Sequence, residues 1–185
     1  MNQNETFMEA VWKPTGLGRE VTLIVGGSLL VALLAQIELP MWPVPVTGQT
    51  FGVLLLGLLL GRRAGLSLMA YVAEGAMGLP VFASGGAGIT HLTGPTGGYL
   101  AGFVAAAFVV GWLAEKGWDR RMGTAVLALL MGNLLIYLFG IPWLAQFTGW
   151  QKVWSLGLVP FIPGDLLKVI LAAAVLPWGW RLLSR

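Results

Sequence analysis

Positive charge in this chain is confined to alternate segments between long apolar runs, and this pattern constrains the fold more than any other feature. If the runs are six transmembrane helices, nine of the 11 lysines and arginines fall on one side of the bilayer. These nine are Lys13, Arg19, Arg62, Arg63, Lys116, Arg120, Arg121, Arg181 and Arg185. Cytoplasmic segments of membrane proteins collect Lys and Arg. The sequence therefore predicts an all-α integral membrane protein, a bundle of six helices with both termini in the cytoplasm.

The composition excludes an ordinary soluble domain. Apolar residues make up 57% of the chain and charged residues 10%, whereas about a quarter of the residues in soluble domains are charged. We assign the net charge of +3 to contact with anionic lipids, not to nucleic acid. The chain contains no cysteine, which excludes disulfides and thiolate chemistry. Because the first 15 residues are polar, we expect no cleaved signal peptide and keep the first run as a span.

We expect a single membrane domain over residues 1–185. Crossing a hydrocarbon layer of about 30 Å takes roughly 20 helical residues. The expected spans lie near residues 20–39, 46–61, 64–79, 97–115, 123–141 and 164–181. The second and third spans are short and meet at Arg62 and Arg63, which predicts a tight helical hairpin.

The three outer connections are long, apolar and rich in Pro and Gly. They cover residues 40–45, 78–98 and 142–163. Irregular backbone is tolerated at membrane depth only where it is buried in protein or lines a cavity. We therefore expect these loops to fold as a cap over a pocket that faces outward.

Asp165 and Lys168, at the start of the last span, are the strongest candidates for a binding site. They are three residues apart, so a helix places them on one face. Charged groups within a span are costly and usually functional. One interpretation is that Lys168 extends to the outer interface and pairs with Asp165. The other is that the pair lines a pocket and binds the polar head of a ligand.

The outer loops supply further candidates. Gly85, Gly86 and Gly88 lie in the most glycine-dense stretch, and Thr96 leads from it into the fourth span. Glycine lets backbone approach a ligand closely, although a compact reversal of the chain would use the same residues. The pattern GxxxxGK[ST] is absent, so we expect no nucleotide hydrolysis. Gln49 either hydrogen-bonds into the same vestibule or caps the second span.

The remaining ionisable groups do not form a catalytic set. His91 is the one histidine and has no acidic or histidine neighbour in the sequence, so we interpret it as structural and expect no metal site. Glu38 and Glu74 fall in outer turns, where they are either hydrated or face the vestibule. We therefore expect a protein without enzymatic activity.

Ser28 and Ala32 lie one turn apart on the first span and give it a face of small residues. Such faces let helices approach closely in lipid. They serve either packing within the bundle or docking of another membrane subunit.

Four short motifs follow one another along the chain: PVPVTGQT at 43–50, GLPVF at 78–82, GPTGGY at 94–99 and PFIPGDLLK at 160–168. Together they resemble the BioY family, the biotin-specific substrate-binding subunit, or S component, of energy-coupling-factor (ECF) transporters. The resemblance runs from about residue 20 to the C-terminus.

The resemblance implies a six-helix subunit of the bacterial plasma membrane that captures biotin from outside, with biotin as ligand and no cofactor. It implies as partners a transmembrane coupling subunit, which would dock on Ser28 and Ala32, and a pair of cytoplasmic ATPases. The alternative is a self-sufficient, solitary or ion-coupled biotin transporter, which usually needs ionisable groups near the bilayer midplane.

The same resemblance assigns roles to particular residues. Asp165 and Lys168 are expected to hold the ureido ring of biotin. Aromatic walls around the rest of the ligand are expected from Trp42, Phe82 and Tyr99. The full expected binding set is Asp165, Lys168, Gln49, Trp42, Phe82, Gly85, Gly86, Gly88, Thr96 and Tyr99.

Overall fold

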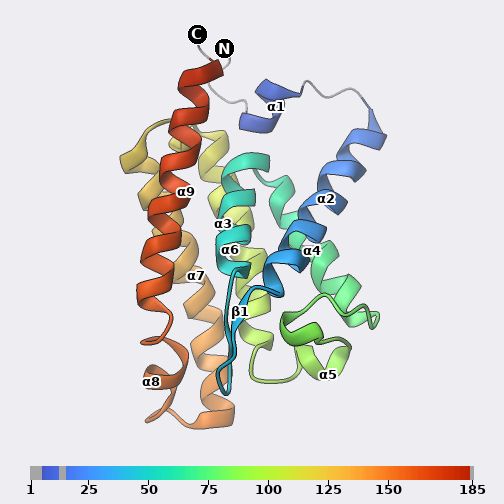
Figure 1. Cartoon of the computed structure of the whole chain (residues 1–185), viewed down its shortest axis with the longest axis vertical. Coiled ribbons are helices and arrows are strands. Elements are labelled where there is room, and N and C mark those ends of the chain that lie inside the picture. The colour runs from blue at the N-terminus through green and yellow to red at the C-terminus, as the bar shows by residue number, and fades with distance from the viewer. Residues whose placement is uncertain (1–5, 13–15, 184–185) are drawn as a thin grey trace.

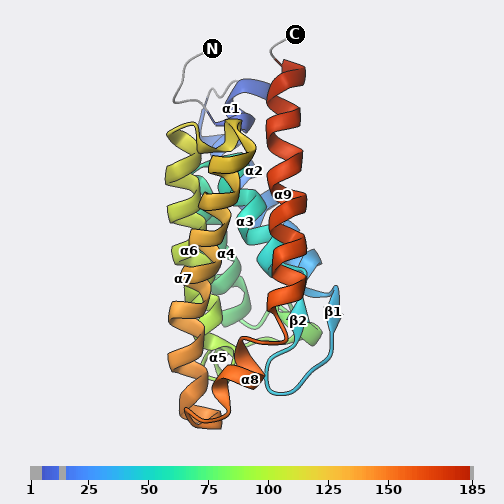
Figure 2. The same ribbon diagram turned by 90° about the vertical axis from the view of Figure 1, so that its left-hand side faces the viewer.

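The computed structural model describes residues 6–12 and 16–183 and is about 75% helical. Six helices of 12 or more residues run along an elongated bundle in this part of the chain (Figures 1 and 2). They are α2 (Leu17–Ala35), α3 (Gln49–Leu60), α4 (Arg63–Ala76), α6 (Gly97–Glu115), α7 (Met122–Thr148) and α9 (Ile162–Leu183). The shorter elements are α1 (Phe7–Val11), β1 (Glu38–Leu39), β2 (Val46–Thr47), η1 (Ala83–Gly85), α5 (Ile89–Leu92), η2 (Trp118–Arg120) and α8 (Val153–Gly157).

Four of the helices in the described residues are long and apolar enough to cross a membrane, namely α2, α6, α7 and the segment that contains α9. The α3 and α4 helices have 12 and 14 residues and fall below this length. They are joined by a turn at Gly61 and Arg62, and Gly61 has a φ of 64° that favours glycine. The expected short hairpin is therefore present, but neither of its helices reaches the length of a complete span.

Several helix ends differ from the expected positions. The α2 helix ends at Ala35 and not near 39, because residues 38–39 pair with residues 46–47 in a small antiparallel sheet. The α9 helix begins at Ile162, with Pro163 in its first turn, where the missing N–H costs nothing.

The largest difference is at the end of α7, which was expected near residue 141 and continues through Pro142 to Thr148. A proline inside a helix costs about 3 kcal/mol. Packing offsets this cost, because Leu144, in the turn after the proline, is fully buried and Trp143 donates to the carbonyl of Gly94 at 2.8 Å. The α7 helix therefore includes residues 142–148, which were expected to belong to the third outer loop.

Large apolar side chains face outward along the long helices, as expected for lipid contact. Leu33 on α2, Leu134 and Leu138 on α7, and Leu167 on α9 are more than half exposed. Small residues occupy the contacts between helices instead: a Cβ added at Gly102 of α6 would lie 2.9 Å from the backbone of Ile136 on α7. These features are those of a multi-pass membrane protein.

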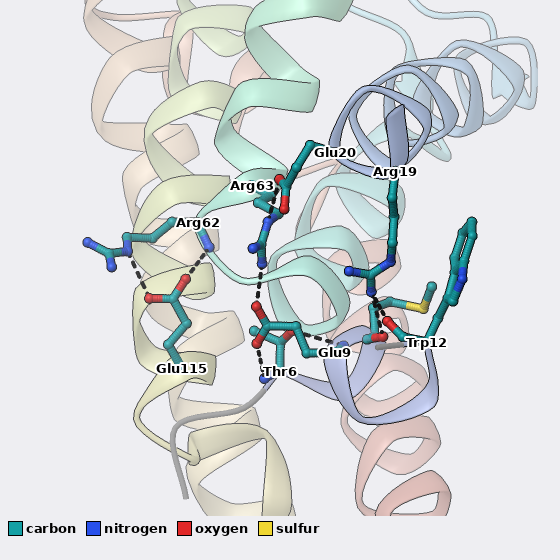
Figure 3. Close-up of polar contacts among 9 residues, drawn as sticks. Thr6, Glu9, Trp12, Arg19, Glu20, Arg62, Arg63 and Glu115 are labelled. Carbon is teal, nitrogen blue, oxygen red and sulfur yellow. Dashed lines mark hydrogen bonds and ion pairs between the residues drawn. The ribbon is translucent and has the colours of Figure 1, made fainter. Parts of the chain in front are cut away.

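Ion pairs tie the helices together at the end of the bundle where α1 lies (Figure 3). Arg63 at the start of α4 bonds Glu9 of α1 at 2.6 Å and Glu20 of α2 at 2.7 Å. Arg62 bonds Glu115 at the end of α6 at 2.8 Å. The α1 helix lies before the first expected span and was not predicted from the sequence, and the bond from Arg63 to Glu9 ties it to α4.

Candidate binding site

A cavity lies at the other end of the bundle, among α3, α6, α7, α9 and the loops that follow α2 and α4. Its polar lining consists of Thr47, Gln49, Thr50, His91, Thr96, Tyr137, Asp165 and Lys168. Its apolar and aromatic lining consists of Val44, Pro45, Ala83, Tyr99, Leu100, Phe103, Ile136 and Phe161. This combination of apolar walls with a few converging polar groups is typical of a small-molecule site.

Lys168 and Asp165 meet inside this cavity and not at the lipid interface. Their side chains are 15% and 8% exposed, and the ammonium lies 3.2 Å from Oδ1 of Asp165. The same ammonium donates to the carbonyl of Thr47 at 2.8 Å and to the hydroxyl of Thr50 at 2.6 Å. The lysine therefore does not extend to the outer surface, and its position matches the interpretation that places the pair in a pocket.

The carboxylate of Asp165 is also held from two other helices. Its Oδ1 accepts a hydrogen bond from Thr50 of α3 at 3.2 Å, and its Oδ2 accepts one from the hydroxyl of Tyr137 on α7. Hydrogen bonds to an ionised carboxylate are stronger than those between neutral groups. Asp165 is thus fixed in orientation before any ligand arrives.

Gln49 lines the pocket as the first residue of α3, and its side chain does not cap that helix. Its carbonyl accepts from the hydroxyl of Thr47 at 2.8 Å, and its amide donates to Tyr71 at 2.6 Å. Tyr71 in turn donates to the carbonyl of Val81 at 3.0 Å. Through this chain Gln49 connects the start of α3 to the loop that follows α4.

The predicted aromatic residues occupy three different positions. Tyr99 lines the cavity, stacks on Phe161 with ring centroids 6.2 Å apart, and donates to the carbonyl of Gly157 at 2.8 Å. Phe82 is fully buried behind the lining, where it stacks on His91 at 4.9 Å. Trp42 is 79% exposed in the loop between β1 and β2, outside the cavity lining.

His91 contributes to the lining, as the sequence did not indicate. Burial lowers the pKa of its imidazole below the ordinary value, which favours the neutral ring at pH 7. The stacked Phe82 holds this ring against one wall. Among the described residues, no group of three or more His, Asp or Glu side chains gathers to hold a metal.

The glycine-rich loop approaches the cavity from outside. Gly85, Gly86 and Gly88 do not line the main cavity, although Gly86 lines a neighbouring hollow, and Thr96 lines both spaces. A Cβ added at Gly86 would lie 2.4 Å from Nδ1 of His91. The close approach made by this glycine is therefore to the imidazole.

Glu38 and Glu74 do not line the cavity, and each accepts a hydrogen bond from a serine. Glu38 accepts from the hydroxyl of Ser84 at 2.6 Å and so joins the β1–β2 loop to the glycine-rich loop. Glu74 accepts from Ser28 at 2.8 Å, and Ser28 is fully buried against α4. Of the predicted docking pair, Ala32 alone keeps part of its surface exposed.

Tyr137 lines the cavity but was not among the binding residues expected from the sequence. One available signal was its position four residues after Asn133, which gives α7 a polar strip in a run of leucines. Thr47 and Phe161 also line the cavity and belong to motifs that the sequence analysis had identified.

The fold and the site define a helical, multi-pass membrane protein with a pocket that combines an acid and a base with aromatic walls. The BioY family model matches residues 4–185. The chain is 42% identical to the probable biotin transporter BioY of Pyrococcus horikoshii, over 85% of this chain and 93% of that protein. It is 43% identical to the biotin transporter BioY of Thermotoga maritima, over 79% and 86%.

A solved structure of an S-component for biotin has a similar fold. The crystal structure at 2.1 Å of the S-component for biotin from an ECF-type ABC transporter superposes with a TM-score of 0.74 at 26% identity, covering 91% of this chain and 92% of that one. The chain belongs to the BioY family.

Proposed function

We propose that this protein captures biotin at the outer face of the bacterial plasma membrane, as the substrate-binding subunit of an ECF-type transporter. The observation that carries the proposal is the buried Asp165 and Lys168 pair at the wall of an otherwise apolar cavity. The ureido ring of biotin has two N–H donors and one carbonyl acceptor. A carboxylate can accept a hydrogen bond from a ring N–H, and an ammonium can donate one to the ring carbonyl.

The hydrogen bonds in the cavity indicate how the ring would enter. The three donors of Lys168 all have partners in the described structure: Thr47, Thr50 and Asp165. A ligand carbonyl must therefore replace one of these partners. Asp165 needs no such exchange, because a carboxylate has about four acceptor positions.

The apolar part of biotin would lie against the ring stack of Tyr99 and Phe161, with Thr96 and Gln49 at the polar margin. Phe82 would act indirectly by holding His91 in the wall. Gly85, Gly86, Gly88 and Trp42 belong to the loops that would close over the ligand, with Trp42 moving from its exposed position.

The protein would supply binding while its partners supply energy, since the chain has no phosphate-binding loop. The coupling subunit would dock on α2, where Ala32 borders the exposed side chains of Val25 and Leu29. Ser28 would join this contact only after leaving Glu74. The short α3 and α4 would lie in the bilayer as the second and third of six spans, covered by the neighbouring helices.

Calorimetry of the purified protein in detergent tests the proposal. We expect biotin to bind without ATP, and Asp165→Asn to lower its affinity at least about tenfold, because a hydrogen bond to a charged group contributes ~1.5–3 kcal/mol. Glu115→Gln, which removes a carboxylate at the opposite end, serves as the control and should bind as the wild type does. Absence of biotin binding by the wild-type protein would refute the assignment. Biotin accumulation in proteoliposomes without ATPases would instead support a solitary transporter.

A further inference from the structure

Another hollow, of about 300 Å³, lies at the η2 turn that connects α6 to α7. The beginning of α7 lies at the end of the bundle that carries α1 (Figure 1). Its lining consists of Lys116, Gly117, Trp118, Arg120, Arg121 and Thr124. Three of these six residues are cations and none is an acid. We propose that this hollow, the basic pocket, binds the headgroup phosphate of an anionic glycerophospholipid from the surrounding membrane.

Neither of the nearby acids, Glu115 and Asp119, lines the basic pocket, although Asp119 interacts with the charge of Arg120. Glu115 precedes Lys116 in the chain but bonds Arg62 on the far side of α6. Asp119 is fully buried and accepts from the indole N–H of Trp180 at 2.6 Å. Within the described part of the chain, Lys116 and Arg121 form no ion pair. The positive charges of Lys116 and Arg121 are therefore available to a ligand.

Aromatic rings hold two of the cations in place. The ammonium of Lys116 lies 3.6 Å from the ring centroid of Trp112, and the guanidinium of Arg120 lies 4.5 Å from that of Trp180. A cation on an aromatic face keeps its full charge while its position is restricted. The α7 helix begins beside the pocket at Met122, and the positive end of its dipole adds to the same field.

The surroundings of the pocket favour a lipid over a soluble anion. Trp112 is 44% exposed and Met122 is 53% exposed, so apolar surface adjoins the three cations. Tryptophan prefers the headgroup level of a bilayer. Basic pockets between helices on the cytoplasmic side are known to bind anionic headgroups, each cation adding to the attraction. A phospholipid can satisfy both surfaces at once, with its phosphate in the pocket and its acyl chains beside the indole.

Another hollow at the same end of the bundle provides an internal comparison. It is lined by Glu9, Arg62, Arg63, Leu66, Phe108 and Glu115. Its two arginines are paired with its two glutamates. This balanced hollow has no excess charge for a phosphate, which makes Arg62 a matched control at the same end of the bundle.

Native mass spectrometry of the delipidated protein, titrated with dioleoyl-phosphatidylglycerol or dioleoyl-phosphatidylcholine, tests the proposal without any use of biotin. We expect the wild type to prefer the anionic lipid. The double variant Lys116→Gln/Arg121→Gln should lower its apparent affinity for phosphatidylglycerol about 25-fold, since each of the two cations contributes roughly a fivefold factor. Binding of phosphatidylcholine should not change, and Arg62→Gln should behave as the wild type does.

Three results would overturn the proposal. The first is equal binding of both lipids by the wild type, a measurement that does not depend on how the variants fold. The second is unchanged lipid preference in a double variant that elutes as a single species with wild-type helical circular dichroism. The third is displacement of phosphatidylglycerol by excess inorganic phosphate, which would assign the pocket to a soluble anion.

Discussion

The hydroxyl of Tyr137 on α7 donates a hydrogen bond to Oδ2 of Asp165 on α9. The other carboxylate oxygen accepts from Thr50 on α3 and from Lys168 one turn further along α9. One buried acid therefore joins three helices at the cavity wall. The residue proposed to bind the ligand is also one that fixes the distance between the helices around it.

Tyr137→Phe removes this donor and leaves the ring in place. We expect the affinity for biotin to fall about tenfold, because a hydrogen bond to a charged group contributes ~1.5 kcal/mol or more to the orientation of the carboxylate. Calorimetry measures the change. Tyr99→Phe is the control for loss of a tyrosine hydroxyl in general, because the Tyr99 hydroxyl bonds the carbonyl of Gly157 and not Asp165. Wild-type affinity in Tyr137→Phe would show that the hydrogen bond from Tyr137 to Asp165 does not contribute to biotin binding.

Ser84 tests whether the outer loops are held together by one contact. Its hydroxyl bonds Glu38 at 2.6 Å, and its φ of 56° is the one positive value among the non-glycine residues described. Ser84→Ala removes the contact and keeps the unfavourable backbone, whereas Ser84→Gly removes the contact and relieves the backbone. We expect both variants to release biotin about fivefold faster in stopped-flow measurements, since a typical hydrogen bond contributes ~1 kcal/mol.

The same pair of variants separates the two effects in thermal unfolding. Ser84→Gly should unfold at a higher temperature than Ser84→Ala because glycine tolerates positive φ. Equal release rates in the wild type and both variants would exclude a role for this contact in retaining the ligand.

Gly75 on α4 determines whether the ring of Phe82 fits behind the cavity. A Cβ added there would lie 2.0 Å from the ring, and Phe82 has no exposed surface into which to retreat. We expect Gly75→Ala to lower the free energy of unfolding by ~1–3 kcal/mol, the usual cost of overpacking. Gly26→Ala on α2, where a Cβ meets nothing within 4 Å, is the matched control and should be neutral or stabilising. Equal melting temperatures for the two variants would contradict this account.

The sequence was sufficient to predict the long helices and the shared helical face of Asp165 and Lys168 for a physical reason. Apolar runs and the distribution of Lys and Arg depend on the bilayer, and the three-residue spacing of Asp165 and Lys168 depends on the helix alone. The course of α7 through Pro142 could not be predicted, because the packing of Leu144 that offsets the proline is a contact between distant segments. The position of Trp42 outside the cavity depends on the loop conformation in the same way.

The hydrogen-bond partners of buried polar side chains could not be predicted from the sequence either. Ser28 was expected either to pack within the bundle or to lie on a docking face. Its hydroxyl bonds Glu74 on α4, a pairing of two residues 46 positions apart. Gln49 was considered as a cap and instead bonds Tyr71. In both cases a polar side chain within the bundle bonds a partner on another helix, as interhelical contacts in lipid favour, and periodicity does not reveal which partner that is.

Asp119, in η2 beside the last turns of α9, should make stability depend on pH. Burial raises the pKa of its carboxyl to about 6, while the bond from Trp180 opposes the shift. Between about pH 4 and pH 6 the folded protein therefore binds more protons at this site than the unfolded chain does, so the contribution of Asp119 to stability falls as pH rises through this window. Asp119→Asn keeps an acceptor for the indole and removes the charge. We expect its melting temperature to exceed that of the wild type at about pH 7 and to approach it at about pH 4, and a difference that stays constant across this range would show that the buried carboxyl does not titrate there.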